Sequence, residues 1–133
     1  MSANEISLPP FGVAVEPSRA ASFARETGFL TAPEDPPLCY PAVWLTSPEI
    51  LNAVERICAE ARCAPVHEKQ RFVYDSPLRF GAQYRLSVVL RREAEPERLA
   101  ITARVETEEG ACVARVETLL RLVSRAVLEE AGA

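Results

Sequence analysis

The segment VHEKQRFVYDSPLRFG contains the only histidine of the chain, His67, at the start of an alternating, strand-like run. A histidine can act as a general acid or base when a carboxylate or a nucleophile lies within hydrogen-bond reach. The sequence does not by itself supply such a partner. Three interpretations of His67 therefore stay open: a catalyst, a residue that binds a ligand or a partner chain, and a strand end without a special role.

The other reactive side chains indicate no metal or redox chemistry. The four cysteines show neither C-x-x-C spacing nor neighbouring histidines, which argues against a zinc site or a thioredoxin-like motif. In a chain of this size without a signal peptide, we expect free, mainly buried thiols. These residues are Cys39, Cys58, Cys63 and Cys112.

The length and composition indicate one globular domain. The 133 residues are 48% apolar, which is enough to form a core, and the formal net charge is -4. Nucleic-acid binding needs a basic surface, but the arginines here alternate with glutamates. The N-terminus lacks a basic stretch followed by an apolar one, and no run approaches the roughly 20 apolar residues that span a bilayer. We therefore expect a soluble, cytoplasmic protein with neither a nucleic-acid nor a membrane partner.

Two helices are expected in the first half of the chain. The segment FGVAVEPSRAASFARETGF reads as a strand over 11–15 and then a helix with Pro17 near its first turn. A longer helix follows, with Ser47 and Pro48 typical of its N-terminus, although it could equally begin near Pro41 and bend at Pro48. Its apolar content predicts burial on more than one side. The apolar residues at helical spacing are Ile50, Leu51, Val54, Ile57 and Cys58.

From His67 onward the apolar residues alternate with polar ones, which is the pattern of half-buried strands. The run before Asp75 and the segments QYRLSVVLRRE, LAITARVETE and ACVARVETLLRLV predict four strands. The segments SPLRFG, EAEPER and EEGA are turns, and short turns between neighbouring runs favour an antiparallel meander.

These elements predict an α+β fold in which a five-stranded antiparallel sheet wraps around the long helix. The helix is expected to cover one sheet face because that face is apolar, while the other face stays polar. The predicted organisation is an N-terminal lead over 1–10, a single domain over 11–123 and a C-terminal tail over 124–133.

This order of elements resembles the hot-dog fold of MaoC-like dehydratases, over 11–123. In that family an H-G-E-Q segment precedes an alternating strand, a Pro-Leu pair and a Gly turn. Here these are His67-Glu68-Lys69-Gln70, Pro77-Leu78 and Gly81. The segments VEPSRAASFARETG, CYPAVWLTSPEI and VETEEGACVARVETLLRLV are similar to the family's first helix, the start of its central helix and its closing hairpin. The nearest subgroup is the non-catalytic half-module of double-hot-dog enoyl hydratases, together with the non-catalytic subunit of heterodimeric (3R)-hydroxyacyl thioester dehydratases.

The resemblance also implies a catalytic Asp and His just after the first helix, in a pattern like G-D-x-N-P-x-H. This pair handles a water and the α-proton of the thioester. In this sequence Phe29 stands at the Asp position, and no histidine stands about five residues after it. Glu34 and Asp35 are acidic, but they lie in a proline-rich loop and are expected to be solvated.

The resemblance further implies a binding site in two parts. His67 would lie beside the acyl pocket, and the start of the central helix would polarise the thioester carbonyl near Pro41, Ala42 and Val43. Tyr40 and Trp44 would be pocket walls, although they could equally be core aromatics. The arginines that could meet a phosphate of the thioester carrier are Arg71 and Arg79, but exposed arginines on strand edges are commonly just solvated.

Three functions remain open from the sequence. The first is a non-catalytic acyl-thioester-binding subunit paired with a catalytic hot-dog chain. The second is a stand-alone homodimeric hydratase or thioesterase, for which Glu49 and Glu55 are the nearest carboxylates, both expected to face solvent. The third is an acyl-CoA binder without a reaction. All three imply an acyl-CoA or acyl-carrier-protein thioester as ligand, and none implies a cofactor or a metal.

Overall fold

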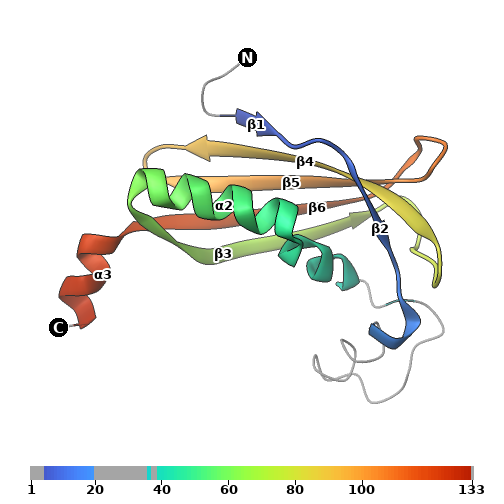
Figure 1. Cartoon of the computed structure of the whole chain (residues 1–133), viewed down its shortest axis with the longest axis horizontal. Coiled ribbons are helices and arrows are strands. Elements are labelled where there is room, and N and C mark those ends of the chain that lie inside the picture. The colour runs from blue at the N-terminus through green and yellow to red at the C-terminus, as the bar shows by residue number, and fades with distance from the viewer. Residues whose placement is uncertain (1–4, 20–35, 37–38, 133) are drawn as a thin grey trace.

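The computed structural model describes residues 5–19, 36 and 39–132, and it contains an antiparallel sheet with one long helix lying across it (Figure 1). This is the α+β architecture that the sequence predicts. The elements in chain order are β1 (Glu5–Ser7), β2 (Phe11–Ala14), the 3-10 helix η1 (Tyr40–Thr46), α2 (Pro48–Ala61), β3 (Cys63–Tyr74), β4 (Gln83–Glu93), β5 (Arg98–Glu106), β6 (Cys112–Ser124) and α3 (Arg125–Gly132).

The sheet has six strands rather than the expected five. Its order is β1-β4-β5-β6-β3, and β2 also pairs with β4, so that β1 and β2 share one edge. The chain leaves this edge at Pro9 and Pro10, which have no N–H to donate to a strand ladder. Part of the segment expected as an N-terminal lead therefore belongs to the sheet, and the expected tail contains α3.

The expected meander holds only for β4, β5 and β6. β3 pairs antiparallel with β6 and not with β4, although the turn SPLRFG joins β3 directly to β4. The connection after β3 therefore runs from one edge of the sheet to β4, which lies beside β1 and β2 at the opposite edge. This places β3 at one edge of the sheet, next to the C-terminal strand.

One face of the sheet and one side of α2 form the core. The inner residues of β4 and β5 alternate strictly with half-buried or exposed ones. α2 was expected to be buried on more than one side, but its buried residues form a single stripe, and Leu51 is 43% exposed. The stripe consists of Ile50, Val54, Ile57 and Cys58.

The start of α2 combines both possibilities left open by the sequence. Ser47 is its N-cap and Pro48 is in its first turn, while η1 forms a separate helical segment that includes Pro41. The Ser47 side chain makes no cap hydrogen bond, and its hydroxyl is buried without a partner in the described structure. Residues 17–19 begin the expected first helix, but the rest of that helix lies outside the described residues.

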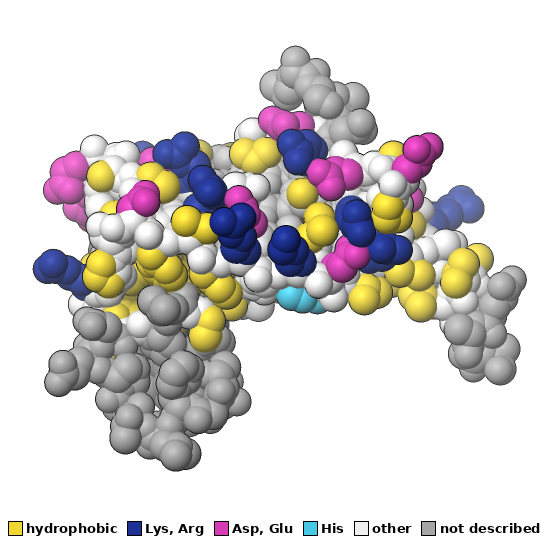
Figure 2. All heavy atoms as spheres, turned by 180° about the vertical axis from the view of Figure 1, so that it is seen from behind, with side chains coloured by type: hydrophobic (Ala, Val, Ile, Leu, Met, Phe, Trp, Pro, Cys, Tyr) yellow, Lys and Arg dark blue, Asp and Glu magenta, His cyan; other side chains and the backbone are white. Residues whose placement is uncertain are grey.

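The outer face of the sheet is polar, as expected. Figure 2 shows basic and acidic side chains interspersed over this face, with apolar side chains between them. Ion pairs join several of these residues, including Arg71 with Glu117 and Arg91 with Glu93. No helix in the described part of the chain is long and apolar enough to cross a bilayer.

Candidate functional site

The inner row of β3 lies along one edge of the sheet and continues the core there only in part, since Pro65 and His67 are exposed. This row consists of Cys63, Pro65, His67, Gln70, Phe72 and Tyr74, which pair with inner residues of β6 or continue their alternation. A β-bulge between His67 and Lys69 inserts Glu68 as an extra residue. Because of this extra residue, His67 and Gln70 lie on the same face even though they are three positions apart.

His67 is exposed, and its ring contacts a carboxamide rather than a carboxylate. Its Nε2 lies 2.9 Å from Oε1 of Gln70, on the same strand. Since the carboxamide oxygen can only accept, the hydrogen bond needs the tautomer that carries a proton on Nε2. Gln70 therefore orients the ring through this hydrogen bond, but a carboxamide is not basic enough to take the proton from it.

Glu68, which flanks His67 in the sequence, is held on the outer face. It accepts two hydrogen bonds from Arg98, at 2.7 and 2.8 Å, and a third from Arg121 at 3.1 Å. The hydrogen bonds from Arg98 are the main cause of a Glu68 pKa of about 2, well below its ordinary value of 4.5. The carboxylate nearest to His67 in the sequence is thus ionised and directed away from it.

The Glu68 cluster should make stability depend on pH. Because the folded-state pKa lies below the ordinary one, the stabilisation is fully present above pH 4.5 and is lost as the pH falls toward 2. Glu68→Gln should therefore lower the urea midpoint at pH 7, and the difference from wild type should shrink between pH 4.5 and 2. Glu109→Gln, in the exposed β5–β6 turn, is the control and should show no such change. A difference in urea midpoint between wild type and Glu68→Gln that stays constant down to pH 2 would contradict the lowered pKa of Glu68.

Tyr40 and Trp44 are core residues that fix η1 to the N-terminal strand. Tyr40 is 1% exposed and Trp44 is 6% exposed. Trp44 donates from Nε1 to the Ala14 carbonyl at 3.2 Å, and its ring meets the Tyr40 ring edge-on, with centroids 5.7 Å apart. The Tyr40 hydroxyl accepts from the Glu16 N–H at 3.4 Å. These contacts support the core interpretation of both aromatics over the pocket-wall interpretation.

The start of η1 offers few backbone donors. Pro41 is buried and has no N–H, and the Ala42 N–H donates to the Cys39 carbonyl at 3.0 Å. Ala42 and Val43 are half-buried. A ligand carbonyl at this point would therefore have to compete with the turn for the Ala42 N–H.

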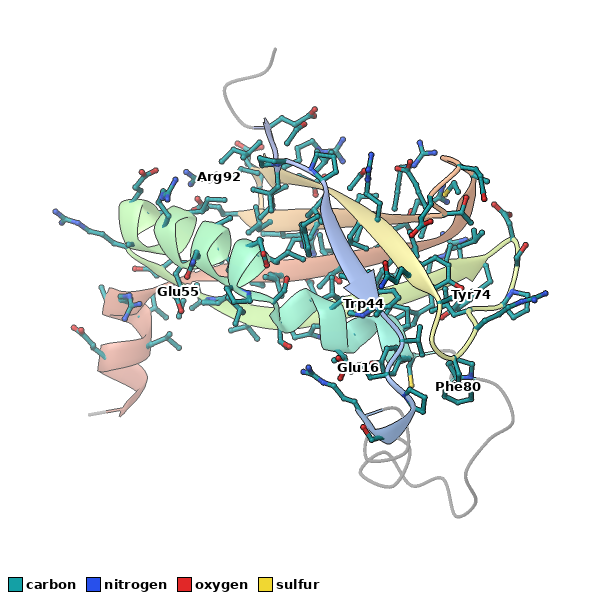
Figure 3. All side chains as sticks on the ribbon, turned by 45° about the vertical axis from the view of Figure 1, so that its right-hand side comes forward. Glu16, Trp44, Glu55, Tyr74, Phe80 and Arg92 are labelled. Carbon is teal, nitrogen blue, oxygen red and sulfur yellow. The ribbon has the colours of Figure 1, made fainter. Side chains whose placement is uncertain are left out.

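The two parts of the expected binding site lie at opposite ends of the sheet. Leu120 pairs with both His67 and Leu99, and Leu99 pairs with Arg92, so His67 belongs to the row of Arg92. Trp44 packs against Tyr84, near the other end of β4. Figure 3 shows Trp44 and Tyr74 at one end and Arg92 at the other. Arg92 and Tyr84 are eight residues apart on β4, so at about 3.3 Å per residue the two rows are roughly 26 Å apart.

Tyr74, in the inner row of β3, has a raised pKa. Burial is the main cause, followed by the proximity of Cys39 and Tyr84. A phenol in this state stays protonated at neutral pH, so it can donate a hydrogen bond but cannot serve as a base.

The other charged candidates lie on the surface. Arg71 lies 3.7 Å from Glu117 on the outer face, and Arg79 is also exposed. Glu49 and Glu55 are exposed on α2, as expected. Phe29, at the expected dyad position, and the acidic residues Glu34 and Asp35 lie outside the described residues.

The cysteines are free thiols, as the sequence predicts. Cys58 and Cys63 are buried, and burial, reinforced by the nearby Cys63, raises the pKa of the Cys58 thiol. A raised pKa makes a thiol a poor nucleophile at neutral pH. Over residues 5–19, 36 and 39–132, no group of three or more His, Cys, Asp or Glu side chains could hold a metal ion.

The open hollows formed by the described residues include three with volumes of about 890, 450 and 230 Å³. The largest is formed by β2 and β4 with Glu108, and the smallest lies on the outer face around Lys69, Arg71 and Arg91. Neither His67 nor the residues from Tyr40 to Trp44 line any of these three.

Two polar residues of the inner face, Gln70 and Thr118, were missed as site residues by the sequence reasoning. Gln70 was only part of a motif match, and Thr118 was not considered. Thr118 stands directly opposite Gln70 in the β3–β6 pairing and is 7% exposed. The available signal was the alternation of β6, which places Thr118 in the same inward stripe as Val116 and Leu122.

Several solved structures have a similar fold, although the sequence itself finds no match among family models or curated proteins. The HadBC (3R-hydroxyacyl-ACP dehydratase) complex of Mycobacterium tuberculosis contains a similar chain, with a TM-score of 0.68 at 13% identity over 90% of this chain and 97% of that one.

Two further solved structures agree with this comparison. A MaoC-like dehydratase also has a TM-score of 0.68, at 12% identity over 92% of this chain and 42% of that one. A hot-dog-like protein from Thermanaerovibrio acidaminovorans has a TM-score of 0.56, at 15% identity over 96% and 88% of the two chains. The chain therefore has the hot-dog fold, as its resemblance to MaoC-like dehydratases implies.

Proposed function

We propose that the chain is a non-catalytic, acyl-thioester-binding subunit of a cytoplasmic (3R)-hydroxyacyl thioester dehydratase, in which a second hot-dog chain supplies the catalytic groups. The observation that carries this proposal is the environment of His67. The only histidine of the chain is bonded to a carboxamide, and the carboxylate beside it in the sequence is bound by two arginines on the other face. Hydration of an enoyl thioester needs an acid and a base in reach of one ligand.

Pairing with another chain is supported by the unequal edges of the sheet. The edge made by β1 and β2 is short and interrupted by two prolines, whereas β3 is a continuous 12-residue edge strand with a single proline, Pro65, near its start. An edge strand of this length that pairs with no further strand of the described residues is a ready site for pairing with a second chain. The inner row of β3 would then lie in the groove between the two chains.

The stand-alone thioesterase is less well supported. It would need a carboxylate directed toward the ligand from α2, but Glu49 and Glu55 are exposed on the side of this helix that faces solvent. A binder without any reaction would resemble the proposed subunit when studied alone. Only the addition of a catalytic chain separates these two possibilities.

We predict that His67→Ala weakens binding of butyryl-CoA by about 1–2 kcal/mol, the contribution of one or two hydrogen bonds. This corresponds to a roughly five- to thirty-fold higher Kd. Isothermal titration of the purified protein measures the effect, with free CoA as the reference ligand. Because His67 is an exposed edge-strand residue, the variant should fold normally.

Lys69→Ala is the matched control, since Lys69 is exposed on the outer face of the same strand. This variant should bind butyryl-CoA like the wild type. If His67→Ala binds normally but turnover with a catalytic partner falls a thousandfold, His67 is a catalyst. If neither quantity changes, His67 is a strand end without a special role.

A further inference from the structure

Four exposed arginines form an oblique line across the outer face of the sheet, one on each of the neighbouring strands β4, β5, β6 and β3. Those on β5 and β6 stand directly opposite each other in the strand pairing. Those on β4 and β3 are each displaced by two residues along their strands, in opposite directions. Figure 2 shows basic side chains across the middle of this face. This arginine line consists of Arg85, Arg104, Arg115 and Arg71.

The arginine line keeps a positive excess, although the formal net charge of the chain is -4. In the strand pairing, Glu106 stands opposite Arg85, and Glu108 in the β5–β6 turn lines the same hollow as Arg85. Glu117 stands opposite Arg71. The line is roughly 20 Å long, because it crosses three strand spacings of about 4.8 Å and shifts by about four residues along the strands. Four arginines therefore face these three glutamates over this length.

The same face contains a second pair of directly opposed arginines, and a carboxylate joins that pair. Arg98 stands opposite Arg121 in the β5–β6 pairing. Glu68 accepts hydrogen bonds from both guanidinium groups, at 2.7 and 2.8 Å from Arg98 and 3.1 Å from Arg121. Like charges directly opposite each other on neighbouring strands are destabilising, and a carboxylate between them offsets this repulsion. The protein thus shows which chemical group suits two opposed arginines on this face.

The central pair of the arginine line is not bridged in this way. Arg104 lies 4.0 Å from Glu106, whose carboxylate also accepts a hydrogen bond from Oγ of Ser87 at 3.0 Å. Arg115 lies 3.2 Å from Glu117. Each of these arginines contacts a glutamate of its own strand. Over the residues that the structure describes, no carboxylate therefore joins the two guanidinium groups across β5 and β6.

We propose that the arginine line binds an acidic, extended segment of a partner protein, with one carboxylate between Arg104 and Arg115. An extended peptide covers roughly 20 Å in about six residues, and alternate side chains recur about every 6.6 Å, so successive carboxylates can reach successive arginines. Nucleic acid fits this surface less well, because its binding depends on neutralising many phosphates and three glutamates lie among the four arginines. The inference is independent of the proposed function, which concerns the inner face of the sheet.

The test measures binding of a fluorescein-labelled peptide of four Glu-Ser repeats to the full chain by fluorescence anisotropy. Wild type should bind this peptide more tightly than a peptide of four Gln-Ser repeats, and added salt should weaken the binding because exposed charge pairs are screened. The double variant Arg104→Gln, Arg115→Gln should bind the acidic peptide roughly tenfold more weakly, the combined effect of two exposed charge pairs. Its melting temperature should stay close to that of wild type, because both side chains are exposed.

The double variant Lys69→Gln, Arg91→Gln is the matched control, since it removes two exposed positive charges from the same face but outside the arginine line. It should bind the acidic peptide within about twofold of wild type. An equal loss in both double variants would show that only the overall charge matters, and would overturn the inference. Unchanged binding by Arg104→Gln, Arg115→Gln would overturn it too, as would tighter binding of decathymidylate than of the acidic peptide. Failure of wild type to bind the acidic peptide would also overturn it and would leave the proposed function intact.

Discussion

The purified chain is expected to hydrate crotonyl-CoA no faster than buffer, and to contribute to rapid hydration only when a catalytic hot-dog chain is added. Each missing acid or base typically costs about 10²–10⁴ in rate, and the chain has neither the Asp nor the His of the hydratase pattern. The measurement is the loss of enoyl absorbance with the chain alone, the catalytic chain alone, and the two together.

We expect a background rate for this chain alone, a weak rate for the catalytic chain alone and a strong rate for the two together. Light scattering of the same samples should find two-chain particles, and a mass of one chain at micromolar concentration would contradict pairing through β3. Hydration by this chain alone that follows it through successive columns would show that it is an enzyme in its own right. Equal rates with and without it would show that it is not a subunit of that catalytic chain.

The second large effect is expected at Trp44. Trp44→Ala should lower the free energy of unfolding by about 3–5 kcal/mol, because it removes a buried aromatic side chain and leaves a cavity. Trp44 also donates a hydrogen bond to the Ala14 carbonyl, so the variant loosens the link between η1 and β2. Urea unfolding followed by circular dichroism measures the change, since Trp44 is the only tryptophan and its fluorescence is lost with it.

Trp44→Phe is the matched variant, and it should cost less because most of the aromatic volume is kept. This pair of variants separates the two interpretations of Trp44. A pocket wall would lose ligand affinity on truncation while the protein stayed stable. A core aromatic would lose stability first, which is the result that its contacts with Tyr40 and Tyr84 predict.

The strands from β3 to β6 could be predicted because their signal is local. Each has an alternation of apolar and polar residues, and Pro or Gly marks the turns between them. The start of α2 at Ser47 and Pro48 was one of two starts that the sequence left open, the other being near Pro41. β1 was missed because its three residues are too few to show any period.

Features that depend on distant parts of the chain could not be predicted in this way. Nothing in the residues of β3 indicates that its partner is β6. Strands that follow each other in the sequence usually pair, but β3 and β4 do not. The one-sided burial of α2 is likewise a property of what surrounds the helix rather than of its composition.

The candidate site was predicted less well than the fold. Strict alternation places residues three apart on opposite faces of a strand, so His67 and Gln70 would have been assigned to different faces. The bulge at Glu68 brings them to the same face, and none of the residue types in VHEKQRF predicts a bulge. Thr118 was overlooked because a threonine in an apolar stripe looks like an ordinary strand residue.

The pairing of β3 with β6 also bears on how the chain matures. During synthesis β3 leaves the ribosome before β4, β5 and β6, so it must wait for its neighbour while the hairpins of β4, β5 and β6 can close locally. Until β6 is complete, the nascent chain exposes both edges of β3. The strand that carries His67 and Gln70 therefore stays unpaired until β6, its neighbour in the described sheet, has been made.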